Sequence, residues 1–466
     1  MAHPDPSMDT EQWLPSEKLL VAVSSGVVFL DALDASLTQV ALPSIGASLH
    51  LDEAQLQWIV SAYVLGYGGF LLLGGRCADV LGRRRVLLWG LVALMAASLL
   101  GTVVSDGTLL IAARFAKGMS AAFTAPAALS ILSTSFAEGP HRNRALGIYT
   151  AAAACGFTFG LVSGGLLTQL TWRATFAVVV PAAAVLLVAA LRVVPGDEPA
   201  AGGRLDLGGA LTVTAGALLF VRAVVEAPTA GWLSPETVVE LVLAAALLAA
   251  FVALERTVAQ PLVRLALLRS ATLVRANVGA LLLFGCATVF NVVNTLYEQD
   301  VLGWGPLKTG LVFMAASITT ALLAPRIGPI ATRLDPDWLL LAGGVAMLAS
   351  FLAFLATGTT TSYPPIVASL VLMGAGFALA YPSLNIQALA GVADAEQGLA
   401  SGLVGSSLQI GGAVLLAIST AATLAATPAR AGAHELVHGL HAGMCVALAG
   451  AGLITLVTAG ALVRAT

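Results

Sequence analysis

The sequence is poor in charged residues, and this shortage excludes several classes of protein. Charged residues make up 10% of the 466 positions and the mean hydropathy is +0.92, whereas ordinary soluble domains carry about 25% charged residues. So little polar surface cannot cover a water-soluble globule, which argues against a soluble enzyme. The formal net charge of −3 supplies no basic field for nucleic acid. We therefore expect the lipid bilayer as a partner and no nucleic acid.

Cysteines are also scarce, and their positions predict neither a disulfide framework nor a metal site. The four residues are Cys77, Cys155, Cys286 and Cys445, each far from the others in sequence. No pair has the spacing of metal ligands or of a stapled small domain. They are typical of small buried apolar residues. We expect no cofactor and no metal in this chain.

Apolar runs are what the sequence has in abundance. A helix needs about 20 mainly apolar residues to cross the hydrocarbon of a bilayer, and fourteen runs of that kind occur, in groups of six, two and six. The two groups of six predict an internal repeat, as in transporters built from two similar halves. The expected fold is an all-α integral membrane protein. Its predicted parts are a cytoplasmic tail (1–18), a six-helix bundle (19–194), a linker with two extra transmembrane helices (195–276) and a second six-helix bundle (277–463).

The basic residues predict how these runs are oriented. Of the 22 Lys and Arg residues, 14 lie in the loops after even-numbered runs and 3 in the loops after odd-numbered runs. Cytoplasmic loops are enriched in Lys and Arg. Fourteen spans with both termini in the cytoplasm explain this bias.

A glycine- and arginine-rich loop follows the second run, from Gly75 to Arg85, with the sequence GRCADVLGRRR. Gly82 permits a tight turn, and the arginines can stay at the level of the lipid headgroups. The run resembles the signature of the same loop in the major facilitator superfamily, where it latches the two halves on the cytoplasmic side. The resemblance implies a conformational gate formed by Gly75, Asp79, Gly82, Arg83 and Arg84.

Glycines recur along the fifth run and follow the spacing of a known motif. Glycines on one helix face allow close approach of a neighbouring helix. The pattern resembles the antiporter signature of the exporters in this superfamily, with Leu161 where that signature has Pro. The end of the first run, 33–43, is similar to that of the fourteen-span drug:proton antiporters. The antiporter motif comprises Gly147, Gly156, Gly160, Gly164 and Gly165.

Four ionisable residues fall inside the predicted membrane spans, Asp31 and Asp34 in the first and Arg114 and Lys117 in the fourth. Such residues are costly in lipid and are functional candidates by default. Each pair has the i, i+3 spacing that shares one helix face, and the depths predict that Asp31 faces Lys117 and Asp34 faces Arg114. Arg114 matches the superfamily's fourth-span signature, whose Arg is implicated in proton coupling. We expect these four residues to couple transport to protons, with a static ion-pair ladder as the alternative.

Polar side chains on other spans are candidates for a substrate cavity. Two acids facing two bases leave this interior near neutrality, which disfavours a preference for multivalent cations. Hydrogen bonding between helices is the alternative role for each candidate. The candidates are Tyr63, Tyr67, Tyr149, Asn291, Asn294, Tyr381, Asn385, Gln387 and Gln409.

The expected function is proton-coupled efflux of small amphipathic or hydrophobic compounds, such as a drug or antibiotic, by alternating access. The resemblance implies a monomer in the cytoplasmic membrane of a bacterium whose partners are a small-molecule substrate and protons, and no enzyme. One alternative is a proton-coupled importer of a metabolite with the same fold. Another is a membrane metallopeptidase, which rests only on the HELVH segment at 434–438, a zinc-peptidase pattern.

Overall fold

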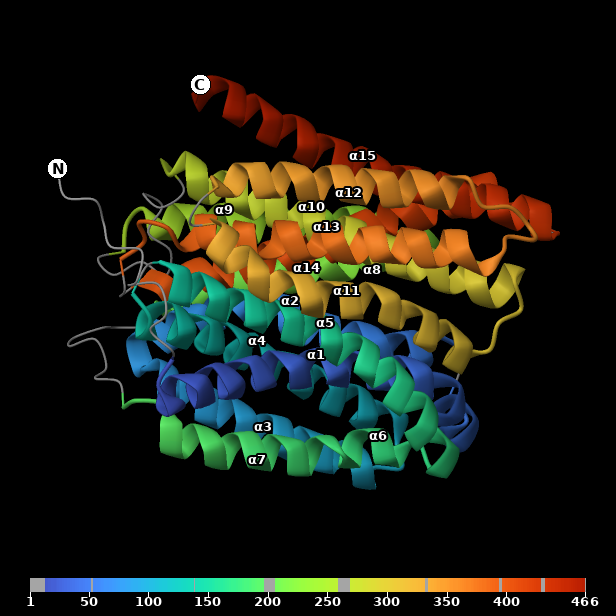
Figure 1. Ribbon diagram of the computed structural model, residues 1–466. Coiled ribbons are helices and arrows are strands. Elements are labelled where there is room, and N and C mark those ends of the chain that lie inside the picture. The colour runs from blue at the N-terminus through green and yellow to red at the C-terminus, as the bar shows by residue number, and fades with distance from the viewer. Residues whose placement is uncertain are drawn as a thin grey trace.

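The computed structural model describes residues 13–51, 53–137, 139–196, 206–258, 269–331, 334–393, 396–428 and 432–465. Every regular element within these ranges is a helix (Figure 1). Parts of the predicted tail (1–18) and linker (195–276) lie outside the described residues. The elements are α1 (Pro15–Leu49), α2 (Glu53–Leu81), α3 (Arg83–Val103), α4 (Gly107–Ser135), α5 (Pro140–Leu170), α6 (Arg173–Ala177), α7 (Val179–Val193), α8 (Leu207–Ala230), α9 (Pro235–Glu255), α10 (Ala271–Leu296), η3 (Tyr297–Val301), α11 (Pro306–Ala331), α12 (Pro336–Leu355), α13 (Tyr363–Leu389), α14 (Gln397–Ala426) and α15 (Ala433–Ala465).

Fourteen helical segments of the described chain are long and apolar enough to cross a membrane, which confirms the predicted number of spans. The short helix α6 and α7 together form one span, and α10 with η3 forms another. The helices run side by side, with the start of α1 and the end of α15 at one end of the bundle (Figure 1). We call this end, where α1 begins and α15 ends, the terminal end, and the opposite end the distal end.

The polar residues that flank the apolar runs determine where several helices begin. Asp106, Asp206, Ser234 and Ser270 each accept a hydrogen bond from the backbone N–H three residues later, at the starts of α4, α8, α9 and α10. These caps satisfy N–H groups that have no partner within their own helix. Gly82 joins α2 to α3 with a φ of 98°, a left-handed conformation that favours glycine.

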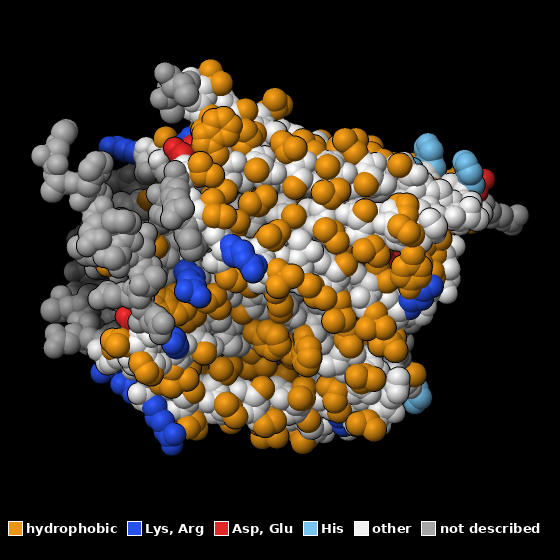
Figure 2. All heavy atoms as spheres, in the orientation of Figure 1, with side chains coloured by type: hydrophobic (Ala, Val, Ile, Leu, Met, Phe, Trp, Pro, Cys, Tyr) orange, Lys and Arg blue, Asp and Glu red, His pale blue; other side chains and the backbone are white. Residues whose placement is uncertain are grey.

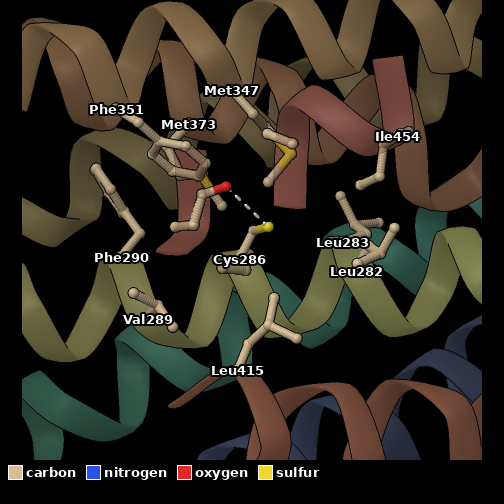
Figure 3. Close-up of a cluster of buried hydrophobic side chains, with 14 of the residues drawn as sticks. Leu282, Leu283, Cys286, Val289, Phe290, Met347, Phe351, Met373, Leu415 and Ile454 are labelled. Carbon is tan, nitrogen blue, oxygen red and sulfur yellow. Dashed lines mark hydrogen bonds between the residues drawn. The ribbon is translucent and has the colours of Figure 1, made fainter. Parts of the chain in front are cut away.

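Two large apolar cores lie in the two groups of six helices. One is formed mainly by α1 to α7 and the other by α10 to α15. Figure 3 shows the second core around α10, where the Cys286 thiol donates to the Ala447 carbonyl of α15 at 3.3 Å. Phe290 of α10 and Phe351 of α12 pack beside it. The labelled side chains come from α10, α12, α13, α14 and α15, and Val312 and Phe313 of α11 belong to the same core. Each group is therefore held by its own buried apolar surface.

The two groups meet along two seams, α2 against α14 and α5 against α11. The extra helix α8 lies across the first seam, where Val221 packs with Leu65 of α2 and Ala413 of α14. The other extra helix, α9, packs on α8. On the face drawn in Figure 2, hydrophobic side chains cover the middle of the molecule and Lys and Arg gather toward the terminal end. This is the surface expected of a protein that spans a bilayer.

Candidate functional site

Asp34 is the centre of a buried cluster of charges between α1 and α4. Its side chain is 0% exposed, and Arg114 and Lys117 of α4 are 1% and 0% exposed. Arg114 Nη1 lies 3.3 Å from Asp34 Oδ2, and Lys117 Nζ contacts Asp34 Oδ1. One carboxylate therefore binds two cations in a region without water contact. The predicted Asp34–Arg114 pair is present.

The two cations also make contacts outside the ion pairs. The guanidinium of Arg114 donates from Nε to the Ile59 carbonyl at 3.2 Å and lies 4.6 Å from the centre of the Tyr63 ring. Lys117 Nζ lies 4.5 Å from the centre of the Phe176 ring. Aromatic faces attract cations, so these rings partly compensate for the lost hydration of two positive charges that share one carboxylate.

The predicted pair of Asp31 with Lys117 is wrong. Asp31 Oδ2 instead accepts a hydrogen bond from the Thr124 hydroxyl at 3.0 Å, and its Oδ1 has no hydrogen-bond partner among the described residues. The prediction placed each residue by its depth along its own run, which contains no information on how α1 and α4 pack against each other. The two helices therefore have a different register, and Lys117 reaches Asp34. The cluster contains one doubly paired acid and one acid without a cation.

The glycines of α5 position the helix that carries these acids. A Cβ on Gly156 would overlap the Phe29 carbonyl of α1, and one on Gly160 would lie 2.6 Å from the Leu33 carbonyl oxygen. Gly164 also faces α1, since a Cβ there would lie 3.3 Å from the Leu37 Cα. The close packing predicted for this face is thus present beside Asp34.

The other two glycines of the motif lie elsewhere. A Cβ on Gly147 would overlap the Ala324 carbonyl of α11, so this glycine lies at the seam between the two groups of helices. A Cβ on Gly165 would have no atom within 4 Å. The motif therefore combines contacts within one group, a contact between the groups and one open position.

The glycine- and arginine-rich loop makes a contact between the two groups at the terminal end. Asp79 Oδ2 accepts a hydrogen bond at 2.8 Å from the backbone N–H of Leu399, in the first turn of α14. A carboxylate at a helix N-terminus is favoured by the helix dipole and the unpaired N–H groups there. Gly75 lies against Gly402 of α14, since a Cβ on Gly402 would be 3.4 Å from the Gly75 Cα. The two groups are thus in contact at this end.

The arginines of this loop stabilise its conformation. Arg83 lies 3.8 Å from the Asp79 carboxylate and donates to the Thr134 hydroxyl of α4 at 2.9 Å. Arg84 donates to the Leu191 carbonyl of α7 at 2.6 Å. The loop is therefore tied to α4 and α7 of its own group, and Asp79 ties it to α14.

Three of the predicted cavity residues meet near Asp31. Tyr67 of α2, Tyr149 of α5 and Tyr381 of α13 lie close enough to interact electrostatically, and Asp31 interacts with Tyr67 and Tyr149. Tyr63 donates from its hydroxyl to the Asp31 backbone carbonyl at 3.2 Å. This tyrosine group brings α2 and α5 of one group of helices together with α13 of the other, beside the acid that lacks a cation.

The remaining predicted cavity residues are spread over the second group of helices. Asn294 and Asn385 donate to carbonyls of their own helices, Phe290 and Tyr381, and are buried. Gln387 donates to the Asp337 carboxylate of α12 at 3.1 Å. Asn291 is half-buried on α10. Gln409 of α14 lies opposite Gly68 of α2, so among these five it is the one placed at a seam.

Sequence reasoning missed the burial of Glu298, an acid in η3. Its position at the end of an apolar run gives no reason to expect burial, and a solvated acid is the ordinary expectation there. The side chain is 0% exposed and neither carboxylate oxygen has a hydrogen-bond partner among the described residues. The signal that reveals it is the π-helical turn of η3, a local geometry that is frequent at functional sites.

The HELVH segment does not form a metal site in the structure. His434, Glu435 and His438 are exposed in the first turns of α15 at the distal end. In the part of the chain that the structure describes, no group of three or more His, Cys, Asp or Glu residues is placed to hold a metal ion. Glu435 instead accepts from the Gly432 backbone N–H at 2.9 Å.

Comparisons with known proteins agree with this architecture. The sequence model of the Major Facilitator Superfamily matches residues 25–416. The chain belongs to the Major Facilitator Superfamily. Its fold is therefore that of a membrane transporter, which confirms the predicted family and that the chain is not an enzyme.

Individual relatives cover most of the chain. It is 37% identical over 417 residues to the cephamycin export protein CmcT of Amycolatopsis lactamdurans, covering 87% of this chain and 85% of that protein. It is 34% identical over 450 residues to the puromycin resistance protein pur8 of Streptomyces alboniger, covering 92% and 87%. The crystal structure of the human organic anion transporter MFSD10 (TETRAN) matches with a TM-score of 0.66 at 18% identity, covering 95% of this chain and 100% of that chain. The last comparison shows a shared fold.

Proposed function

We propose that this transporter exports small amphipathic or hydrophobic compounds, such as an antibiotic, in exchange for protons. The observation that carries the proposal is the buried Asp34 held by Arg114 and Lys117, beside Asp31, which has no cation. A carboxylate whose pairing changes with protonation can link proton binding to conformation. The names of the relatives, an export protein and a resistance protein, support the direction of transport.

Alternating access in this proposal occurs by rocking of two bundles, 19–194 and 277–463, around a central site. The contact of Asp79 with the start of α14 closes the terminal end, and the gate residues open it in the other state. The excess of Arg in the loops at this end supports a cytoplasmic location for both termini. The protein then works as a monomer in the cytoplasmic membrane of a bacterium.

The proposed substrate is neutral or weakly charged. Asp31 and Asp34 balance Arg114 and Lys117 in formal charge, so the interior carries no net field that attracts multivalent cations. Tyr67, Tyr149 and Tyr381 supply aromatic faces and hydroxyls at the centre. Such side chains suit amphipathic molecules, because each offers an apolar body and a polar tip.

An efflux assay tests the proposal. Cells that express the chain are loaded with a fluorescent amphipathic dye, and we expect lower accumulation than in control cells, restored by a protonophore. Asp34→Asn is expected to abolish proton-coupled efflux and Asp31→Asn to weaken it. Asp300→Asn is the matched control, because Asp300 is exposed. Full coupling in both Asp31→Asn and Asp34→Asn would overturn the proton role, and raised accumulation with the intact chain would favour an importer.

A further inference from the structure

Glu298 is a buried acid that the proposed coupling cluster does not include. It lies in η3, at the distal end of the span formed with α10, and its side chain is 0% exposed. Neither carboxylate oxygen has a hydrogen-bond partner among the described residues. Burial of an ionised carboxylate without a partner is strongly unfavourable, and such a group becomes neutral instead. The surroundings therefore favour the protonated acid.

The nearest cation does not neutralise this carboxyl. Lys308 of α11 faces Glu298, but its ammonium lies 3.9 Å from the centre of the Trp304 ring and 4.9 Å from that of Tyr363. The two rings stack on each other at 4.7 Å. Lys308 is thus engaged by an aromatic pair. The Thr309 hydroxyl lies near the carboxyl but outside ordinary hydrogen-bond geometry, and it has no other partner among the described residues.

The other elements packed against η3 bring no ion pair to Glu298 in the described structure. On α10 and η3, Tyr297 donates from its hydroxyl to the Gly358 carbonyl at 2.6 Å, and Asp300 is exposed. On α15, His441 packs edge-on against the Phe354 ring at 5.8 Å. The remaining titratable residues at that end of α15 are His434, Glu435 and His438, all exposed.

The π-helical backbone determines which acid of the segment is buried. The Leu302 N–H bonds to the Tyr297 carbonyl, five residues back, at 3.1 Å, and the Trp304 N–H bonds to the Glu298 carbonyl at 2.9 Å. This turn buries Glu298 and leaves Asp300 exposed. π-Helical turns are rare and occur frequently at functional sites.

We propose that Glu298 is a second proton-binding carboxyl, protonated from the distal side while the terminal end is closed. The carboxylate takes one proton from water to become the neutral acid. It returns that proton to water when a conformational change brings the Lys308 ammonium into contact with the carboxylate. The role in transport rests on the proposed proton exchange, whereas the protonation itself can be measured without transport.

The test is the pH dependence of thermal unfolding of the purified full chain in detergent. Because the proposed neutral acid holds a proton that the unfolded chain releases, stability is expected to fall as pH rises above the ordinary titration range of a glutamic acid, by up to tenfold per pH unit in the ratio of folded to unfolded protein. Glu298→Gln is expected to remove this part of the slope, and Asp300→Asn, its matched control, to retain it. An equal slope in Glu298→Gln and the unmodified chain would overturn the proposal.

A second variant and a second background separate this proposal from the proposed function. Glu298→Met, which is also neutral, is expected to fold and to show the same reduced slope. If neither Glu298→Gln nor Glu298→Met folds, the proposal that Glu298 is uncharged in the folded protein is contradicted. The same comparison in the Asp34→Asn background is expected to give the same difference in slope. If both Asp31→Asn and Asp34→Asn retain full coupling while the slope difference persists, the proposed function fails and the assignment of Glu298 stands.

Discussion

The first helices of the two groups, α1 and α10, each belong to a span with a buried acid, but the two acids have different surroundings. Asp34 of α1 is bound by two cations from α4. Glu298, at the end of the span that α10 begins, has no cation and no hydrogen-bond partner among the described residues. Burial of a charge is tolerated when the charge is paired or when it is removed by protonation. The comparison teaches that one fold can contain a buried acid stabilised by cations and another buried acid without a cation, at different depths in the membrane.

The packing of these two helices is otherwise alike. α1 contacts α5, the fifth helix of its group, through Gly160, and α10 contacts α14, the fifth helix of its own group, through Gly411. A Cβ on Gly411 would overlap the Leu281 carbonyl of α10. This similarity is expected of a repeated unit. The halves thus share a mode of packing and differ in where their acids lie and how they are neutralised.

The largest expected loss of stability comes from breaking the ion pairs of Asp34 with Arg114 and Lys117. Asp34→Asn leaves Arg114 and Lys117 as buried cations without their carboxylate, which costs about 3–5 kcal/mol of stability. The added substitution Lys117→Met removes one of the two cations and is expected to recover part of the loss. Denaturant unfolding of the purified variants measures both. Unchanged stability in Asp34→Asn would mean that the ion pairs contribute nothing to the fold.

An intermediate effect is expected from the shared packing. Gly160→Val and Gly411→Val each force a side chain into a helix contact, and overpacking costs about 1–3 kcal/mol. Because the contacts are alike, the two variants are expected to lose similar stability. Only Gly160→Val lies beside Asp34 and should also reduce proton-coupled efflux.

The matched control for this pair is Gly165→Ala. A Cβ at Gly165 meets no atom within 4 Å, and alanine is favoured over glycine in a helix by about 1 kcal/mol. Stability is therefore expected to hold or rise. A loss in Gly165→Ala as large as that in Gly160→Val would refute the contact-based explanation.

The smallest expected effect lies on α10. Asn294 is buried, but its side-chain amide donates only to the Phe290 carbonyl of its own helix. That carbonyl also accepts main-chain hydrogen bonds within the helix, so it does not depend on the Asn294 side chain. Asn294→Leu is expected to change stability by less than about 1 kcal/mol and to leave efflux unchanged. A strong loss of efflux in Asn294→Leu with a stable fold would instead place this residue in the substrate path.

The number of spans and the location of the charged residues were predictable because both depend on local composition. A run of apolar residues about as long as the bilayer is thick specifies a helix regardless of its neighbours. Asp34 and Arg114 stand out for the same reason, since an ionisable residue in such a run has no other explanation than a partner or a function. The glycine face of α5 is equally local, and its contacts at Gly156 and Gly160 are present.

The relative register of two helices was not predictable, because it depends on contacts between distant segments. Asp31 lies opposite Thr124, and Lys117 contacts Asp34, because the packing of α4 against α1 determines the register of the two helices. The burial of Glu298 was not predictable from the sequence for a similar reason. It depends on a π-helical turn and on side chains of α11, none of which leaves a pattern in the sequence around that residue.

The position of α8 makes the two seams of the molecule unequal. The two groups of helices meet along two seams, one formed by α2 and α14 and the other by α5 and α11. Here α8 packs on both α2 and α14 and covers one seam. The α5/α11 seam carries no such cover among the described helices, and Leu166 and Leu311 are exposed beside it. The two seams are therefore covered unequally, with α8 over one and no described helix over the other.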